Sequence, residues 1–180
     1  IDIDGDGTLE IFALGNALYG WRADGSPVVP GSPDALVFRP TRLIGNMSQG
    51  ATGAFFGSPA AADLDGDGSI EVAFAAWDDS LWVVDAETGA LRFGRRCVPK
   101  YSSPALGDLD GDGNLEVVIG SDADTIYAWR ANGAPLNPAY PTGALAPLPD
   151  GAIINYTTPA LADIDSNPQT VEAIHATFRG

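Results

Sequence analysis

The stretch Asp63-Leu64-Asp65-Gly66-Asp67-Gly68-Ser69-Ile70-Glu71 decides the fold, because its pattern Asp-x-Asp-Gly-Asp-Gly-x-x-Glu occurs three times in 180 residues. The other intact copies run from Asp2 to Glu10 and from Asp108 to Glu116, and an altered fourth copy starts at Asp163. Each intact copy gathers four carboxylates within nine residues, so folding presses like charges together unless a cation neutralises them. The pattern therefore predicts a repeat architecture with a metal in each intact repeat.

The spacing of the copies indicates β-propeller blades. The motifs start at positions 2, 63, 108 and 163, so the shortest unit has 45 residues. Short apolar runs such as 72–76 and 81–85 alternate with turn residues, and 22 Gly and 14 Pro interrupt the chain without any helical periodicity. Units of this length with four short strands are typical of propeller blades. We predict an all-β fold of four-stranded antiparallel blades, with repeat units at approximately 1–57, 58–102, 103–157 and 158–180.

The ends of the sequence predict an incomplete propeller. The chain begins inside the first acidic loop and stops after the second strand expected in the fourth unit. Two full blades and two partial ones would leave strand edges unpaired. We therefore expect a segment of a longer propeller of about six to eight blades, with further blades supplied by the same or another chain.

Turns and aromatic residues follow the repeat. The dipeptides Asp24-Gly25 and Asn132-Gly133 predict tight hairpins whose two central residues both have positive φ. Aromatic residues recur at matching places in the third strand of each unit, and packing between blades is the favoured interpretation, with a sugar-binding platform as the alternative. These aromatic residues are Tyr19, Trp21, Trp82, Tyr127 and Trp129.

Calcium is the metal that the loops favour. Ca²⁺ takes six to eight oxygen ligands from flexible loops, whereas zinc prefers His and Cys, which these loops lack. Odd positions of the motif offer carboxylates, except that position 7 offers its backbone carbonyl. The predicted ligands of the three intact loops are Asp2, Asp4, Asp6, Thr8 and Glu10; Asp63, Asp65, Asp67, Ser69 and Glu71; and Asp108, Asp110, Asp112, Asn114 and Glu116.

Two other interpretations of the loops are open to test. An EF-hand starts with a similar pattern but needs an acidic residue at position 12 and a helix on each side. Position 12 is Ala13, Phe74 or Ile119 in the three copies, which disfavours the EF-hand. The remaining alternative is a set of acidic turns that hold no metal.

The fourth copy predicts a weaker site. Its possible ligands are Asp163, Asp165, Asn167 and Glu172. Asn167 replaces the third aspartate, both glycines are missing, and one residue is inserted before the glutamate. We expect this loop to bind calcium weakly or to remain empty, so three calcium sites are predicted.

Composition excludes several function classes. A formal net charge of −15 argues against a nucleic-acid partner and against docking on anionic lipid. No apolar run approaches the roughly 18–20 residues of a membrane span. The single cysteine, Cys97, is expected to be a small buried residue, and His175 a structural one. A lyase would need a base such as Lys100, Arg95 or Arg96, for which a solvated patch is the simpler interpretation. We predict no catalytic residues and no site for an organic cofactor.

The motif resembles the FG-GAP/VCBS-type repeat, the calcium-binding blade of integrin α-subunit propellers and of many bacterial secreted proteins. The matching pieces are 56–68 and 103–113, while 18–27 and 127–133 look like the bacterial secreted branch. The resemblance implies a calcium ion between the first two strands of each blade, although family loops often have Asp where this chain has Glu at position 9. It also implies a secreted or cell-surface location.

The resemblance leaves three functions open. The first is a calcium-stabilised extracellular scaffold for binding or adhesion, whose insertions at 28–57 and 136–157 would meet a protein or carbohydrate ligand. The second is the propeller part of a secreted polysaccharide-acting enzyme. The third is a structural subunit of a surface assembly.

Overall fold

The fold is known from a computed structural model of the chain. The structure describes residues 1–40, 57–76, 78–99, 101–121, 125–138, 144–147, 158–165 and 171–174, and for 144–147 it describes the backbone alone. Most of the predicted insertions at 28–57 and 136–157 lie outside these ranges. No helix in the described ranges is long and apolar enough to cross a membrane.

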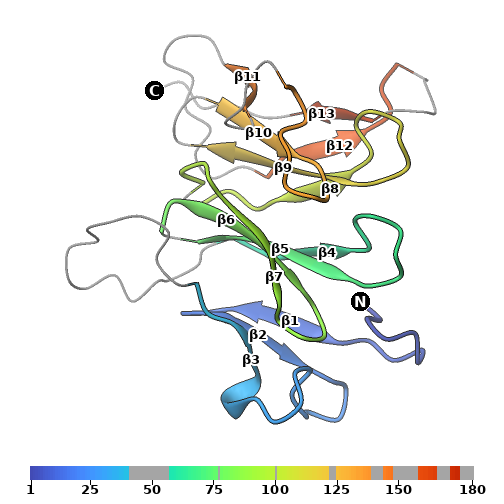
Figure 1. Cartoon of the computed structure of the whole chain (residues 1–180), viewed down its shortest axis with the longest axis vertical. Coiled ribbons are helices and arrows are strands. Elements are labelled where there is room, and N and C mark those ends of the chain that lie inside the picture. Colours follow the sequence, from blue (N-terminus) through green and yellow to red (C-terminus); the bar gives the residue numbers. More distant parts are fainter. Residues whose placement is uncertain are drawn as a thin grey trace.

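The described strands form four antiparallel sheets (Figure 1). The outer two contain three and two strands and the inner two contain four each, always in the order of the chain or its reverse. The first sheet comprises β1 (Ile11–Leu14), β2 (Leu18–Trp21) and β3 (Leu36–Phe38). The second comprises β4 (Ala60–Ala62), β5 (Glu71–Ala76), β6 (Ser80–Asp85) and β7 (Leu91–Arg96). The third comprises β8 (Ala105–Gly107), β9 (Glu116–Ser121), β10 (Thr125–Trp129) and β11 (Ala144–Pro147). The fourth comprises β12 (Ala160–Ala162) and β13 (Glu172–Ile174).

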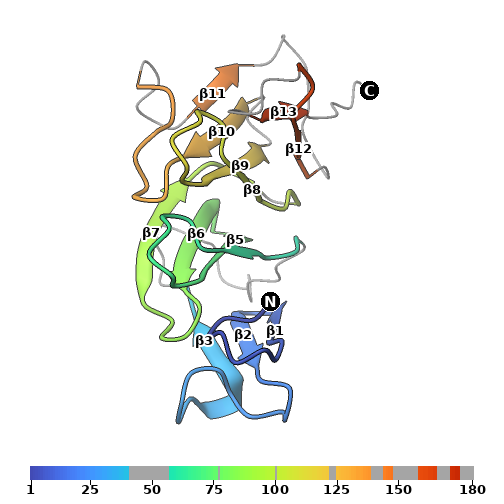
Figure 2. The ribbon, with the colours of Figure 1, turned by 90° about the vertical axis from the view of Figure 1, so that its right-hand side faces the viewer.

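The sheets stack face to face along the long axis of the molecule (Figures 1 and 2). A short 3-10 turn at Pro33–Ala35 precedes β3 and is the single helical element in the described ranges. The prediction of an all-β, incomplete propeller-like fold with two four-stranded blades is therefore confirmed. The second and third loops lie between two strands each and the first leads into β1, so these loops lack the flanking helices that an EF-hand needs.

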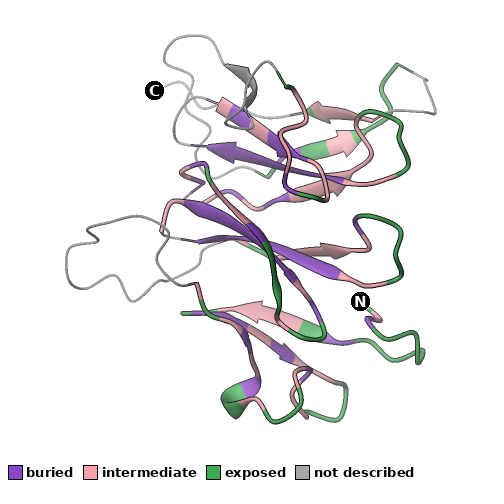
Figure 3. Cartoon of the chain, viewed as in Figure 1, coloured by how far each residue is buried: buried purple, intermediate pink, exposed green. Residues whose placement is uncertain are grey.

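The core lies between the sheets rather than within one of them. Alternate residues of β5 point to opposite faces. Val72 and Phe74 pack with Leu18 and Val37 of the first sheet, whereas Ala73 packs with residues of the third sheet. Figure 3 shows these central strands as buried along their length. The two inner blades thus bury both faces of their central strands, which explains the near-continuous apolar runs at 72–76 and 117–119.

Two of the aromatic residues are packed between blades, as the favoured interpretation requires. Trp82 is 1% exposed in the cluster between the first two sheets, and Trp129 is 0% exposed in the cluster between the second and third. Tyr127 stacks on Trp129 with ring centroids 5.3 Å apart. Tyr19 and Trp21 form an equivalent stacked pair in the first sheet, but both are only half-buried.

The predicted turn type at the two glycine dipeptides is wrong. Gly25 and Gly133 have φ of +84° and +77°, but neither Asp24 nor Asn132 is among the residues with positive φ. Arg130 N–H bonds to Ala134 O, and Gly133 N–H bonds to Arg130 O. These bonds define a three-residue loop in which only the last residue is left-handed, so a single glycine meets the steric requirement.

The glycine at position 89 sets how closely the first two blades approach each other. Gly89 has φ +69°, and a Cβ added there would lie 2.1 Å from the backbone oxygen of Val37 in β3. We expect Gly89→Ala to lower the free energy of unfolding by about 2–4 kcal/mol, from left-handed strain plus overpacking. Gly25→Ala is the matched control, because Gly25 has φ +84° but open space around it. Urea unfolding of both variants measures the difference, and equal losses would contradict the close approach.

Candidate metal centre

The first aspartate of each intact motif organises its loop. Asp63 accepts the backbone N–H of Gly66 at 2.8 Å through Oδ1 and that of Gly68 at 2.9 Å through Oδ2. Asp2 and Asp108 make the same pair of bonds at distances between 2.7 and 3.0 Å. These bonds wrap the loop around one carboxylate, and the glycines of the second loop supply φ of +72° and +91°.

The glutamate that ends each motif is buried because it lies where a strand begins. Glu71 and Glu116 are the first residues of β5 and β9, and they are 1% and 0% exposed. Oε2 of Glu71 accepts the N–H of Leu64 at 3.0 Å, and Oε2 of Glu116 accepts that of Leu109 at 2.8 Å. Glu10 makes the equivalent bond to Ile3 at 3.0 Å. Each loop therefore closes on a carboxylate that water scarcely reaches.

The folded loops bring the predicted carboxylates together in groups of three. Within each group, one oxygen per residue lies within 4.8 Å of the others. The groups are Asp2, Asp4 and Asp6; Asp63, Asp65 and Glu71; Asp108, Asp110 and Glu116; and Asp163, Asp165 and Glu172. The aspartates at position 5 of the second and third loops, Asp67 and Asp112, and Glu10 of the first are not members of these groups.

The residues at position 7 donate hydrogen bonds within the loop. The backbone N–H groups of Thr8, Ser69 and Asn114 donate to the aspartate two positions earlier, at 2.7, 2.8 and 2.8 Å. Hydrogen bonds from these residues lower the pKa of Asp6, Asp67 and Asp112, which keeps these carboxylates ionised in mildly acidic solution. Their predicted role as carbonyl ligands stays a prediction.

The altered fourth loop still closes in the same way. Glu172 Oε2 accepts the N–H of Ile164 at 2.8 Å, and Asp163 and Asp165 lie near this glutamate. Asn167 lies outside the described residues, and the expected weak occupancy of this loop stays a prediction.

Arginines at the loops were not predicted from the sequence. Arg22 pairs with Asp4 at 2.5 Å, Arg92 pairs with Glu71 at 2.6 Å, and Arg130 pairs with Asp112 at 3.0 Å. The available signal was position, since Arg22 and Arg130 each follow the tryptophan that ends the strand beside the loop. Arg92 comes from β7 and has no such signal.

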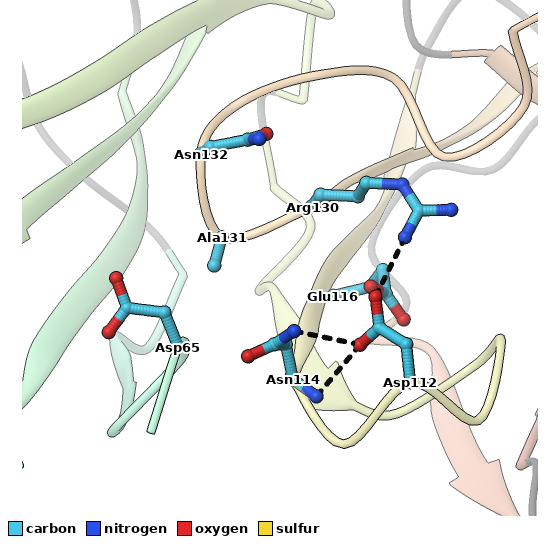
Figure 4. A pocket seen from close by; sticks show the side chains of 7 residues that line it. All are labelled: Asp65, Asp112, Asn114, Glu116, Arg130, Ala131 and Asn132. Atoms are coloured by element: carbon cyan, nitrogen blue, oxygen red, sulfur yellow. Dashed lines mark hydrogen bonds and ion pairs between the residues drawn. The ribbon is translucent and has the colours of Figure 1, made fainter. Parts of the chain in front are cut away.

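A buried oxygen at the third loop lacks a partner within the described structure. Glu116 Oε1 is buried and accepts no hydrogen bond. An open pocket of about 170 Å³ adjoins this carboxylate, lined by Asp65, Asp112, Asn114, Glu116, Arg130, Ala131 and Asn132 (Figure 4). Leaving a buried acceptor unsatisfied is costly, whereas a cation among Asp108, Asp110 and Glu116 would satisfy it. The donor set is all oxygen and fits a hard divalent ion.

Burial gives Glu116 a distinctive dependence on pH. It raises the pKa of this carboxyl from 4.5 to about 7, because the charged form is poorly solvated. The folded state without metal therefore binds this proton more tightly than the unfolded state. We expect chelator-treated protein to lose about 3 kcal/mol of stability as pH rises from about 4.5 through about 7.

Chemical denaturation at a series of pH values, with and without calcium, measures this dependence. Glu116→Gln should flatten the curve of the metal-free protein. Calcium should reverse the trend in the wild type, because metal binding requires the ionised carboxylate. An unchanged slope in Glu116→Gln would assign the dependence to other groups.

The remaining candidate residues lie outside the acidic loops. Cys97 is buried as expected, and burial raises the pKa of its thiol. Arg95 donates to Gly133 O at 2.7 Å across two blades, and Arg96 pairs with Asp79 at 3.7 Å. Lys100 and His175 lie outside the described residues.

A comparison with known families agrees with this geometry. Residues 63–119 match the family model described as an FG-GAP-like repeat. The matched segment covers the second acidic loop, the rest of that blade, and the third loop with most of β9. No curated protein matches the chain.

Proposed function

Because residues 63–119 form an FG-GAP-like repeat, we propose that the protein is a calcium-stabilised propeller scaffold that serves binding or adhesion outside the cell. The observation that carries the calcium proposal is the buried, unpartnered Oε1 of Glu116, a residue that belongs to a group of three close carboxylates. The same group recurs at the equivalent point of the neighbouring blades. Fold alone does not imply function, so the ligand class rests on the arguments below.

Calcium would link the ends of two neighbouring strands. In the second loop, Asp63 directly follows β4 and Glu71 begins β5, so one ion would join the ends of neighbouring strands. The third loop joins β8 to β9 in the same way. Backbone bonds extend the connection between blades, since Leu115 N–H donates to Leu64 O at 2.8 Å. Calcium at these loops would therefore stiffen the contact between blades as well as each blade.

An open blade face supports the proposal that further blades pack on this segment. Ile11 and Trp21 pair on β1 and β2, as do Ala13 and Tyr19. The equivalent pairs of the third sheet, Val117 with Trp129 and Ile119 with Tyr127, are covered by the second sheet. In the first sheet, Ile11 is 62% exposed. A further blade of the same kind, with small and branched side chains facing Tyr19 and Trp21, would fit this face.

The proposed ligand is a protein or carbohydrate that meets loops on this rigid frame. Loops held by a stiff scaffold are where binding sites usually lie. The concentration of calcium outside cells suits sites built from exposed loops, which supports a secreted or cell-surface location.

Isothermal titration of metal-free protein with CaCl₂ tests the calcium part of the proposal. We expect saturable binding to the three intact loops and much weaker binding of MgCl₂, because these flexible loops impose no octahedral geometry. Absence of calcium binding at millimolar concentration would refute the proposal. A glycan array and a protein-ligand screen with calcium-loaded protein then test the ligand class.

A further inference from the structure

We propose that a resident arginine competes with calcium at each intact loop, so that the guanidinium is the counter-ion of the metal-free loop and leaves the ligand oxygens when calcium binds. This inference rests on the proposed function. It assigns a role in setting calcium affinity to Arg22, Arg92 and Arg130, none of which belongs to the repeated motif.

The contacts of Arg92 carry the argument furthest. Its Nη2 atom lies 2.6 Å from Glu71 Oε1, 3.2 Å from Asp65 Oδ2 and 3.4 Å from Asp67 Oδ2. Asp65 and Glu71 are two of the three carboxylates that converge in this loop. The guanidinium therefore occupies oxygens that a metal in the second loop would need.

The third loop shows the opposite balance between the glutamate and the aspartates. Arg130 pairs there with Asp110 and, at 3.0 Å, with Asp112, while Glu116 Oε1 has no partner. The corresponding oxygen of Glu71 is the one that Arg92 contacts. In the second loop, the guanidinium of Arg92 thus places a positive charge at the buried glutamate. The corresponding oxygen in the third loop has no such contact.

Arginine reaches these loops from two different places in the blade. Arg22 and Arg130 each follow a tryptophan whose strand partner, Ile11 or Val117, directly follows the loop glutamate. In the second blade the position opposite Glu71 is Asp85, which would repel the loop. Arg92 on β7 supplies the guanidinium instead. The second loop therefore receives its arginine from a different strand than the other two loops do. Repetition of one sequence position would not produce this, so we infer that the positive charge itself matters at the loop.

Competition follows from charge and exposure. A guanidinium within hydrogen-bond distance of the ligand oxygens would face a divalent ion of like sign across the same carboxylates, and the two repel. The side chains of Arg22, Arg92 and Arg130 are 31%, 34% and 35% exposed, so each can turn into water. Arg130 also lines the open pocket beside Glu116, and Figure 4 shows its side chain extending along that space.

Replacing the arginine tests the inference through two effects of opposite sign. We expect Arg92→Gln to lower the melting temperature of the chelator-treated protein by a few degrees, because the carboxylates lose their counter-ion. We also expect it to tighten calcium binding at one site by about tenfold, because calcium no longer displaces a cation. Arg130→Gln should act in the same way at the third loop.

Competition titration against a chromophoric calcium chelator measures the affinities, and differential scanning calorimetry measures the melting temperatures. Arg96→Gln is the control, since Arg96 pairs with Asp79 away from the loops and should change neither quantity appreciably. Arg92→Lys keeps the charge and should stay near the wild type in both measurements. Arg130→Gln, followed at the third loop by the same two measurements, is the test variant if Arg92→Gln does not fold without calcium.

The outcomes separate this inference from the proposed function. Tighter calcium binding in Arg92→Gln than in Arg92→Lys and the wild type supports competition. If the wild type binds calcium and Arg92→Gln binds it more weakly or equally, the inference is overturned, because the arginine would then hold the carboxylates in place for the metal or have no effect on binding. Absence of calcium binding by the wild type refutes the proposed function itself.

Discussion

Trp129→Ala is expected to lower the free energy of unfolding by about 3–5 kcal/mol, the cost of emptying a large buried site. Trp129 is 0% exposed and belongs to the cluster that joins the second and third sheets. Its ring also stacks on Tyr127 at an interplanar angle of 9°, so the substitution removes an aromatic pair as well as buried area. Guanidinium unfolding monitored by circular dichroism provides the measurement.

The first blade supplies a matched control for this substitution. Trp21 holds the equivalent strand position and stacks on Tyr19 with centroids 6.0 Å apart, but it is half-buried. We expect Trp21→Ala in the 180-residue chain to cost less than half as much as Trp129→Ala, because little covers its outer face. Equal losses would contradict the view that contact between blades, rather than packing within a sheet, stabilises the fold.

Asp63→Ala is expected to have the largest effect of any single change in a loop. The variant loses the two exposed hydrogen bonds to Gly66 and Gly68, worth about 3 kcal/mol together at the low end for a charged acceptor. It also loses the calcium-dependent stabilisation of one site, about 2.7 kcal/mol when calcium stands at 100 times its dissociation constant. Comparing urea unfolding in calcium and in chelator separates these two contributions.

Glu87→Ala is the control for Asp63→Ala, because Glu87 is an exposed acidic residue in the β6–β7 turn, outside the acidic loops. Its removal should leave stability in calcium and in chelator almost unchanged. If Asp63→Ala loses the same amount of stability in both conditions, the second loop contributes hydrogen bonds to the fold but no metal site.

The sequence was sufficient for the fold because the repeat aligns local signals. The second and third motifs each lie between a small-residue strand and an apolar run, and turn residues separate the strands that follow. The order of the strands within each blade follows from these local signals. The same repetition locates the carboxylates, since the strand that starts at Glu71 or Glu116 fixes where the glutamate lies. The turn type predicted at Asn132-Gly133 was wrong because the loop has three residues rather than two. In such a loop only the last residue has to be left-handed.

The arginines could not be predicted because their contacts are long-range. Arg92 contacts Asp65, which lies 27 positions earlier in the sequence. Arg92 is on β7 at the register shift of the β6–β7 pairing, where the shift falls between Val83 and Val84. Register shifts of this kind depend on packing that no local pattern encodes. The unpartnered oxygen of Glu116 could not be predicted either, because no local pattern shows that only Oε2 of this buried carboxylate accepts a hydrogen bond.

Thermal unfolding in the presence and absence of EGTA tests the central claim, that calcium in the acidic loops stabilises the propeller fold. We expect chelation to lower the melting temperature by about 10 °C or more, since about 2.7 kcal/mol per site adds up over three sites. Excess CaCl₂ should restore the melting temperature, and MgCl₂ should not. A melting temperature that is the same with and without EGTA would contradict the account.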